Sequence, residues 1–400
     1  MDQELIELNN EAKKEGKKYA KKRFIYPKIA AGLAEREHTA LVGPRGAGKT
    51  ILLKQLLAGN ESAFYVSLDT SRIEGGLFRL AKELSDSGIK LLLLDEIHGY
   101  PGYDLELKRI YDFLGIKIVL TSSSALTLHE LAADLSRRMR IIKIRPFSFR
   151  EYLFFQNDEL LEPLSFVQLS DEKSSREYLG RALHAEPRLE EYMKGRNYPL
   201  ALGRQDFLPL FRNILETVIN RDLIRTGKVS HDETLHIARL VAYLGKSHPE
   251  DMNYTSIAKN IGISRHMAEK YVGLLEKAFV LHVVPPEGQG VMKEPKVLIA
   301  LPYRLLYRPY EECIGALRED FFVDSAVWLG FGPKYLKTNR GEKTPDYAID
   351  DTVFEIGGPG KGHSQFKGFA LKRKIILTHP GMLDAMRRPL FFMGLLEEGQ

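Results

Sequence analysis

The pattern of apolar and polar positions in the first 150 residues predicts an α/β fold. Short apolar runs bounded by polar residues indicate buried strands at 38–42, 63–68, 90–94, 116–120 and 141–144. Segments of helical composition without a breaker lie at 49–58, 76–85 and 104–114. Because strands that alternate with helices favour a parallel sheet covered by helices, we expect this architecture here.

A glycine-rich segment follows the first expected strand and reads GPRGAGKT. Its spacing is G-x-x-x-x-G-K-[ST], in which glycines let backbone N–H groups turn toward a di- or triphosphate at the start of a helix. We expect Lys49 to reach the β- and γ-phosphates and Thr50 to offer its hydroxyl to Mg²⁺. The predicted nucleotide-binding residues of this loop are Gly43, Pro44, Arg45, Gly46, Ala47, Gly48, Lys49, Thr50 and Ile51.

Two acidic residues end the expected strand at 90–94, in the sequence LLLLDE. The carboxyl ends of strands form the ligand-binding edge of an open α/β sheet. Asp95 is therefore expected to hold Mg²⁺ through its water shell, and Glu96 to orient the attacking water as a catalytic base. Because they follow a complete phosphate-binding loop in the chain, the two acids are stronger evidence for a nucleotide site than they would be alone.

Composition and charge change this picture little. With 400 residues the chain is long enough for two or three domains, and its net charge of +5 permits contact with nucleic acid without requiring it. One cysteine, Cys313, excludes an internal disulfide framework and a cysteine-based zinc site. No apolar run approaches the length of a membrane span, and the polar N-terminus is no signal peptide. We expect a soluble cytoplasmic protein without a membrane partner.

The first 37 residues carry a basic helical segment, 11–23. Its lysines suggest contact with nucleic acid or a membrane surface. A solvated helix face is the favoured alternative, because Glu11 and Glu15 interleave with the lysines.

Four motifs together, GPRGAGKT, LLLLDEIH, VLTSSSA and RPFSFREYL, resemble the prokaryotic AAA-type ATPases that carry a C-terminal restriction-endonuclease-like domain. The resemblance implies an ATPase core at 38–153 and a helical lid at 154–234. It also implies that Thr121 or Ser122 contacts the γ-phosphate or the lytic water, although a helix N-cap would explain one of these hydroxyls equally well.

The same resemblance implies an arginine near the nucleotide, just before the last strand of the core. Arg138 matches that position best and is the third predicted catalytic residue with Lys49 and Glu96, while Arg137 lies beside it. Arg138 could act in its own subunit or reach a neighbouring one, so an oligomer is an open prediction. A surface basic cluster is the competing interpretation.

Residues 235–290 resemble a winged helix. The segment from Thr255 reads as a helix, a tight turn at Gly262, an N-cap at Ser264 and a second helix. Arg265 and Lys270 would lie on the exposed face of that second helix. A role in reading DNA and a role as a spacer or interaction domain are both compatible with this pattern.

Residues 291–400 are expected to form a second α/β domain that resembles the PD-(D/E)-x-K nuclease core. The resemblance assigns Glu319, Asp346 and Glu355 to the metal-binding acids, the latter two on a hairpin. The lysine expected two residues after Glu355 is Gly357, and Lys361 is the candidate substitute. We therefore expect this domain to be degenerate.

The leading functional hypothesis is an AAA-type ATPase that binds and hydrolyses ATP with Mg²⁺, so that the nucleotide state moves the other domains. A nucleotide-gated DNA-binding switch with little turnover is the first alternative. A metal-dependent nuclease that uses Glu319, Asp346, Glu355 and Lys361 is the second. A GTPase is the weakest competitor, because the chain has no N-K-x-D-type motif.

Overall fold

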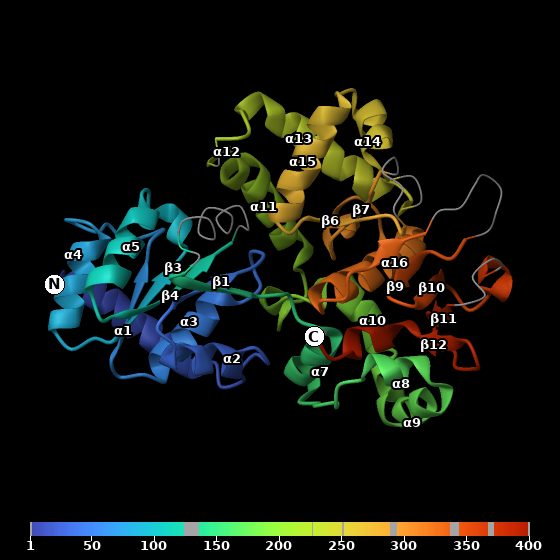
Figure 1. The fold of residues 1–400 in the computed structure, drawn as a ribbon, viewed down its shortest axis with the longest axis horizontal. Helices are drawn as coiled ribbons and strands as arrows, with labels where there is room; N and C mark the ends of the chain where they lie inside the picture. Colours follow the sequence, from blue (N-terminus) through green and yellow to red (C-terminus); the bar gives the residue numbers. More distant parts are fainter. Residues whose placement is uncertain are drawn as a thin grey trace. The chain divides into compact units, whose positions relative to one another are not determined.

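The computed structural model describes residues 2–123, 135, 137–225, 227–249, 252–288, 294–336, 344–366 and 372–398. The chain forms two compact units, Met1–Pro146 and Phe147–Gln400. Figure 1 shows the elements of both units, and each unit is described by itself.

The first unit is built on a five-stranded sheet in the order β2-β3-β4-β1-β5. Every neighbouring pair is parallel, which confirms the predicted α/β fold. The strands are β1 (His38–Val42), β2 (Ala63–Ser67), β3 (Leu91–Asp95), β4 (Lys117–Ser122) and β5 (Met139–Lys143). The strand order changes direction at β1, whose neighbours are β4 and β5, and such a switch point is where open sheets bind ligands.

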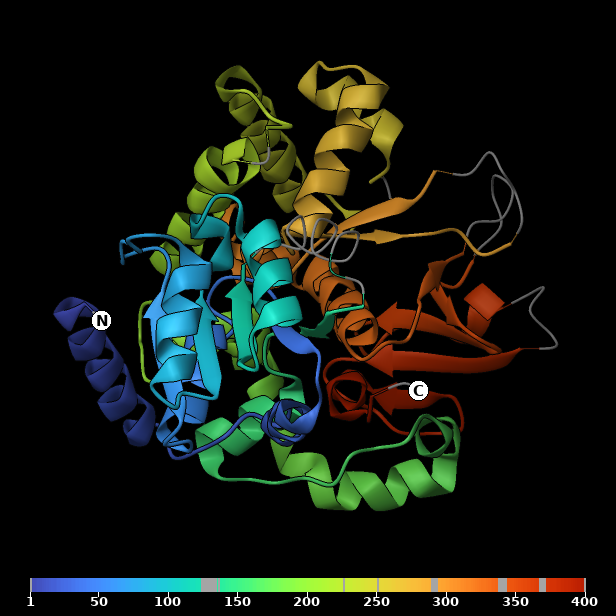
Figure 2. The same ribbon diagram turned by 60° about the vertical axis from the view of Figure 1, so that its left-hand side comes forward.

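Helices cover the sheet of the first unit (Figures 1 and 2). They are α1 (Gln3–Lys18), α2 (Tyr26–Ala31), α3 (Lys49–Ala58), α4 (Leu77–Asp86) and α5 (Tyr103–Phe113). All five residues of β1 and of β3 are buried, so both faces of the sheet are covered. Leu41 and Leu93 share one core with Leu52 and Leu56 of α3.

The N-terminal helix belongs to this unit as a packed element. A Cβ added to Gly16 of α1 would lie 2.0 Å from the carbonyl oxygen of Lys54 in α3, so the two helices are in close contact. Asn9 accepts a hydrogen bond from the backbone N–H of Tyr65 at 2.9 Å. The helix ends at Lys18, earlier than the expected segment 11–23, and Arg23 is buried with 6% exposure.

The second unit contains ten α-helices among its described residues. They are α7 (Phe149–Asn157), α8 (Phe166–Ser170), α9 (Glu172–Ala182), α10 (Arg188–Glu191), α11 (Leu208–Thr217), α12 (Leu223–Arg225), α13 (His231–Lys246), α14 (Tyr254–Ile261), α15 (Arg265–Lys277) and α16 (Tyr310–Trp328).

A second five-stranded sheet has the order β12-β11-β10-β9-β8. These strands are β8 (Lys334–Tyr335), β9 (Tyr347–Ile349), β10 (Thr352–Gly357), β11 (Arg373–Thr378) and β12 (Arg387–Pro389). β10, β11 and β12 run parallel, whereas β8 and β9 are antiparallel to their neighbours. The predicted acid-bearing hairpin is present as β9 and β10, with Asp350 at φ 49° in its turn.

In the second unit, one hydrophobic core includes residues from segments that were expected to form different domains. It joins Phe149 and Tyr152, from the end of the expected ATPase core, and Tyr192, from the expected lid, with Phe321 of α16 and Phe354 of β10. The reason is the aromatic content of these segments, because large rings must be buried against another element. The helices α7 to α10 thus share their core with the C-terminal sheet, and a role as a lid over the nucleotide stays a prediction.

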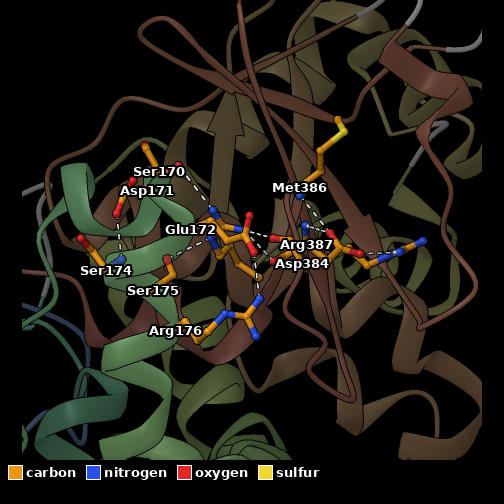
Figure 3. A network of polar contacts seen from close by, with 10 residues as sticks. Ser170, Asp171, Glu172, Ser174, Ser175, Arg176, Asp384, Met386 and Arg387 are labelled. Carbon is orange, nitrogen blue, oxygen red and sulfur yellow. Dashed lines mark hydrogen bonds and ion pairs between the residues drawn. The ribbon is translucent and has the colours of Figure 1, made fainter.

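A buried arginine, Arg388, adds polar contacts to this packing. Figure 3 shows the polar network to which its partners Ser175 and Asp384 belong. The Arg388 guanidinium donates to the carbonyl oxygen of Leu169 at 3.0 Å and to the Ser175 hydroxyl at 2.9 Å, and on its other side to the Asp384 carbonyl at 2.6 Å. Neutral acceptors therefore satisfy it, and β12 is tied to α8 and α9. Burial lowers the pKa of Arg388.

Between α12 and α16 the chain forms the helices α13, α14 and α15 and an antiparallel pair of strands, β6 (Leu281–Val284) and β7 (Lys296–Ile299). Gly262 ends α14 at φ 73°, and the Ser264 side chain accepts from the Met267 N–H at the start of α15, as predicted. These are the elements that a winged helix requires. Its assignment, and its binding of DNA, stay predictions.

Candidate functional site

The phosphate-binding loop connects β1 to α3. Gly46 and Gly48 have φ values of 82° and 87°, a region that side chains with a Cβ rarely adopt. Gly43 is required for a different reason: a Cβ there would lie 1.9 Å from the carbonyl oxygen of Ile144. The glycines of the predicted motif are thus needed for the shape of the loop and for its fit against the segment after β5.

Lys49 is buried at the first position of α3, with 5% exposure. Its Nζ donates to the carbonyl oxygens of Gly43 at 2.8 Å and Pro44 at 3.0 Å. Burial of an ammonium group is favourable only when its N–H groups are bonded. The amine is therefore held at the loop itself, where the sequence predicted it to meet phosphates.

Asp95 ends β3 with 4% exposure, and both of its carboxylate oxygens accept from hydroxyls. The Thr121 hydroxyl donates to Oδ1 at 2.5 Å, and the Tyr65 hydroxyl donates to Oδ2 at 2.9 Å. Burial, together with the negative charge of Asp95, raises the pKa of Tyr65. Each carboxylate oxygen keeps a further lone pair for a water of hydration, so Asp95 fits the predicted role at Mg²⁺.

Glu96 adopts a left-handed backbone conformation, φ 56° and ψ 57°. Its N–H donates to the Thr121 hydroxyl at 2.8 Å, and its Oε2 accepts from the Ser123 hydroxyl at 3.2 Å. His98 Nδ1 also lies 3.2 Å from this oxygen. A left-handed conformation is costly for a residue with a side chain and is held here by neighbours, which is typical of functional sites.

Thr121 lies at the end of β4 and is bonded to both acids. Its hydroxyl has one proton, which is used by Asp95, while its oxygen accepts from the Glu96 amide. A contact of Thr121 or Ser122 with the γ-phosphate or the lytic water stays a prediction. The N-cap alternative does not apply to Thr121 or Ser122, because both lie inside β4 and are fully buried. The following residues of TSSSA, from 124, lie outside the described residues.

Arg138 lies at the opposite edge of the sheet from the loop. Its carbonyl accepts from the His38 N–H at the amino end of β1, whereas the loop follows the carboxyl end of that strand. Its guanidinium donates to Asp112 at 3.0 Å. This geometry contradicts the interpretation in which Arg138 contacts the nucleotide of its own chain, while action on a neighbouring subunit stays a prediction.

Two residues of the candidate site, Tyr65 and Arg23, were not predicted from the sequence. Tyr65 gave no signal beyond its place in a strand. Arg23 was assigned to a basic segment, but its guanidinium donates to the carbonyl oxygens of Ala47 in the loop and of Arg145 after β5. A basic residue close to the first strand of the core was the available hint.

The predicted nuclease-like residues lie together in the second unit. Lys361 forms an ion pair with Glu355, and a Cβ on Gly357 would lie 2.5 Å from the Lys361 Cγ. Lys361 therefore packs over Gly357, the residue that stands where the nuclease motif has its lysine. Asp346 accepts from the Ile356 N–H at 2.7 Å, and Glu319 accepts from Lys296 at 2.7 Å and from Tyr347 at 2.8 Å.

Burial and the neighbouring Glu319 and Glu355 carboxylates raise the pKa of Asp346 to about 7. Burial also raises the pKa of Glu355. Although burial opposes its charge, the nearby carboxylates raise the pKa of Lys361. Among the described residues, no group of three or more His, Cys, Asp or Glu side chains is arranged to hold a metal ion.

The parallel sheet, the loop and the acids define the class of the first unit, a P-loop ATPase domain of the AAA type. Residues 35–153 match the family model of an AAA domain, and residues 198–300 match a domain of unknown function, DUF8612. The chain belongs to the same family as the uncharacterised protein MJ1637 of Methanocaldococcus jannaschii. The two are 31% identical over 338 residues, which covers 75% of this chain and 71% of that protein.

Two more distant similarities complete the comparison. An uncharacterised protein of Haemophilus influenzae is 24% identical over 276 residues, covering 63% of this chain and 64% of its own length. The solved structure of the Walker-type ATPase PABY2304 of Pyrococcus abyssi is 14% identical with a TM-score of 0.43, covering 70% of this chain and 93% of that one.

Within the described ranges, no helix combines the length and apolarity needed to cross a bilayer.

Replacing Thr121 with valine is expected to destabilise the first unit by about 1–3 kcal/mol, because Asp95 and the Glu96 amide each lose a buried partner. Thr121→Ser keeps the hydroxyl and is the matched control, expected to stay closer to the wild type. Urea unfolding followed by circular dichroism measures both. A Thr121→Val protein as stable as the wild type would show that the hydroxyl contributes nothing to this edge of the sheet.

Asp346→Asn is expected to stabilise the protein at pH 8 more than at pH 5. Because the pKa of Asp346 is raised to about 7, the neutral form is favoured in the folded state, and the stability it provides is lost as pH rises through 7. The asparagine keeps an oxygen for the Ile356 N–H and has no charge to bury. Thermal unfolding at both pH values tests this, with the exposed Asp351→Asn as control. An equal effect of Asp346→Asn at both pH values would contradict the raised pKa.

Proposed function

We propose that the first unit binds ATP with Mg²⁺ and hydrolyses it to ADP and phosphate. One observation supports this most directly: the fold brings the loop at the end of β1 and the acids Asp95 and Glu96 at the end of β3 to the same edge of one parallel sheet. That edge is the ligand-binding edge of this class of fold.

The proposed roles follow from the geometry of the loop and its neighbours. The loop N–H groups and the amino end of α3 would receive the phosphates, and Lys49 would exchange its bonds to loop carbonyls for bonds to phosphate oxygens. Thr50 and Asp95 would hold Mg²⁺, which supplies neutralisation of the charge that develops on the phosphates. Glu96 would accept a proton from, or orient, the attacking water.

The alternative of a DNA-binding switch finds less support in α15. Two cations on that helix are already paired with acids of the same unit: Arg265 with Glu294 at 2.7 Å and Lys270 with Glu233 at 2.6 Å. The Lys270 ion pair holds the pKa of Glu233 down, at about 2. Because Arg265 and Lys270 are paired in this way, they offer little charge to a phosphate backbone. Any movement of the second unit with nucleotide state belongs to the same proposal.

Glu96→Gln is expected to lower the rate of ATP hydrolysis by about 10²–10⁴-fold while leaving ATP binding in place, because the amide keeps the shape but cannot take a proton. Lys49→Ala should instead weaken ATP binding by about 10–100-fold, through loss of a charged donor at the phosphates. Phosphate release and the binding of a fluorescent ATP analogue separate the two effects. Glu83→Gln, on the exposed side of α4, is the matched control. If Glu96→Gln hydrolyses ATP at the wild-type rate, Glu96 is not the catalytic base.

For the second unit, the proposal is a structural role of the carboxylate cluster rather than metal-dependent cleavage of nucleic acid. Each acid already accepts from a protein donor: Glu319 from Lys296, Asp346 from a backbone N–H and Glu355 from Lys361. A divalent ion would compete with these donors for the carboxylates.

Supercoiled plasmid incubated with the protein and Mg²⁺ or Mn²⁺ is therefore expected to remain uncut. Gel electrophoresis over several hours measures this, with Asp346→Asn protein prepared in parallel. Cleavage by the wild type that disappears in the variant would restore the nuclease hypothesis, whereas cleavage by both would identify a contaminant.

A further inference from the structure

Arg23 lies between α1 and α2 and is a buried cation outside the phosphate-binding loop. Its exposure is 6%, and its guanidinium bonds three carbonyl oxygens. One Nη donates to Ala47 in the phosphate-binding loop at 2.7 Å. The other donates to Arg145 at 3.0 Å and to Pro146 at 3.3 Å, directly after β5.

The bond to Ala47 concerns the peptide unit that links Ala47 to Gly48. In a trans peptide the C=O and N–H groups point in opposite directions. A donor fixed on the Ala47 oxygen therefore fixes the Gly48 N–H on the opposite side of the same plane. The bond also strengthens the dipole of that unit, because a charged donor polarises the peptide more than a neutral one does.

The other two bonds give the guanidinium a rigid support. Ile144 donates its N–H to Val42 at 2.7 Å, and its carbonyl oxygen leaves no room for a Cβ on Gly43. The segment after β5 is therefore packed against the beginning of the loop. Arg23 bonds that segment and the far part of the loop at once, so the loop is held at both of its ends.

The chain segment just before Arg23 is hydrogen-bonded to α3. Gln55 donates its side-chain amide to the carbonyl oxygens of Tyr19 at 2.8 Å and Lys21 at 2.9 Å. The residues just before Arg23 thus have a defined position relative to the helix that follows the loop.

We propose that Arg23 is a positioning residue of the nucleotide site, which orients the Ala47–Gly48 peptide so that the Gly48 N–H serves the bound phosphates. This rests on the proposed function and adds a residue that lies outside the loop motif. A planar guanidinium suits the role, because its donors lie on separate nitrogens in one fixed plane and can bond the loop and the segment after β5 at the same time.

The test is Arg23→Gln in the full chain, compared with Arg23→Lys and with Lys22→Gln, which removes an equal charge at the exposed neighbouring residue. Arg23→Gln is expected to raise the Kd of a fluorescent ATP analogue and the KM for ATP about tenfold, with kcat changed less than about threefold. Arg23→Lys should fall between this variant and the wild type, and Lys22→Gln should match the wild type.

A merely structural role would give another result. Partial unfolding lowers the fraction of active protein, and so lowers kcat while KM and Kd stay as they are. That outcome, or an unchanged Kd in Arg23→Gln, overturns the inference. If the wild type itself fails to bind the analogue, the proposed function fails instead, so the two failures are distinguishable.

Discussion

A loop that turns its backbone N–H groups toward a phosphate leaves its carbonyl oxygens without partners from regular secondary structure, and buried carbonyl groups must be bonded. In this protein, cations provide those bonds. Lys49 holds the oxygens of Gly43 and Pro44 from inside the motif, and Arg23 holds the oxygen of Ala47 from outside it. The shape of the loop in this structure depends on this arrangement. When a nucleotide binds as proposed, Lys49 would exchange its bonds, whereas the bond from Arg23 to Ala47 would remain.

The acidic side of the site depends on a second shared group, the Thr121 hydroxyl. It donates to Asp95 and accepts from the Glu96 amide, so one side chain of β4 sets the positions of the last residue of β3 and of the residue that follows it. Tyr65 approaches Asp95 from β2 on the other side. The Asp95 carboxylate is therefore oriented by hydroxyl groups from the strands on both of its sides. This contact explains why Thr121 and Tyr65, which carry those hydroxyls, occupy buried positions in β4 and β2.

The sequence was most informative where a function constrains residue type and spacing together. The motif GPRGAGKT and the pair Asp95–Glu96 lie at one edge of the sheet, as the sequence predicted, because the hydrophobic pattern of the strands and the motifs that follow them agreed. Arg23 and Tyr65 could not be found in this way, since their partners lie 24 and 30 positions further along the chain. Arg138 was misplaced for a related reason: a motif match gives position in the chain, but the edge of the sheet follows from strand direction.

In the second unit, buried arginine side chains bond segments that the sequence analysis had assigned to different domains. Arg388 bonds Leu169 and Ser175, more than two hundred residues away, and Arg304 donates to the carbonyl oxygens of Leu244 and Ser247 in the segment expected to be a winged helix. Segments expected to be lid, winged helix and nuclease-like domain were separated by their local patterns, and those patterns carry no record of such contacts. Buried arginines bonded to distant carbonyls have a high cost if their partners are lost, because the charge then remains without compensation. The parts that they join are therefore expected to unfold as one cooperative unit rather than as three domains.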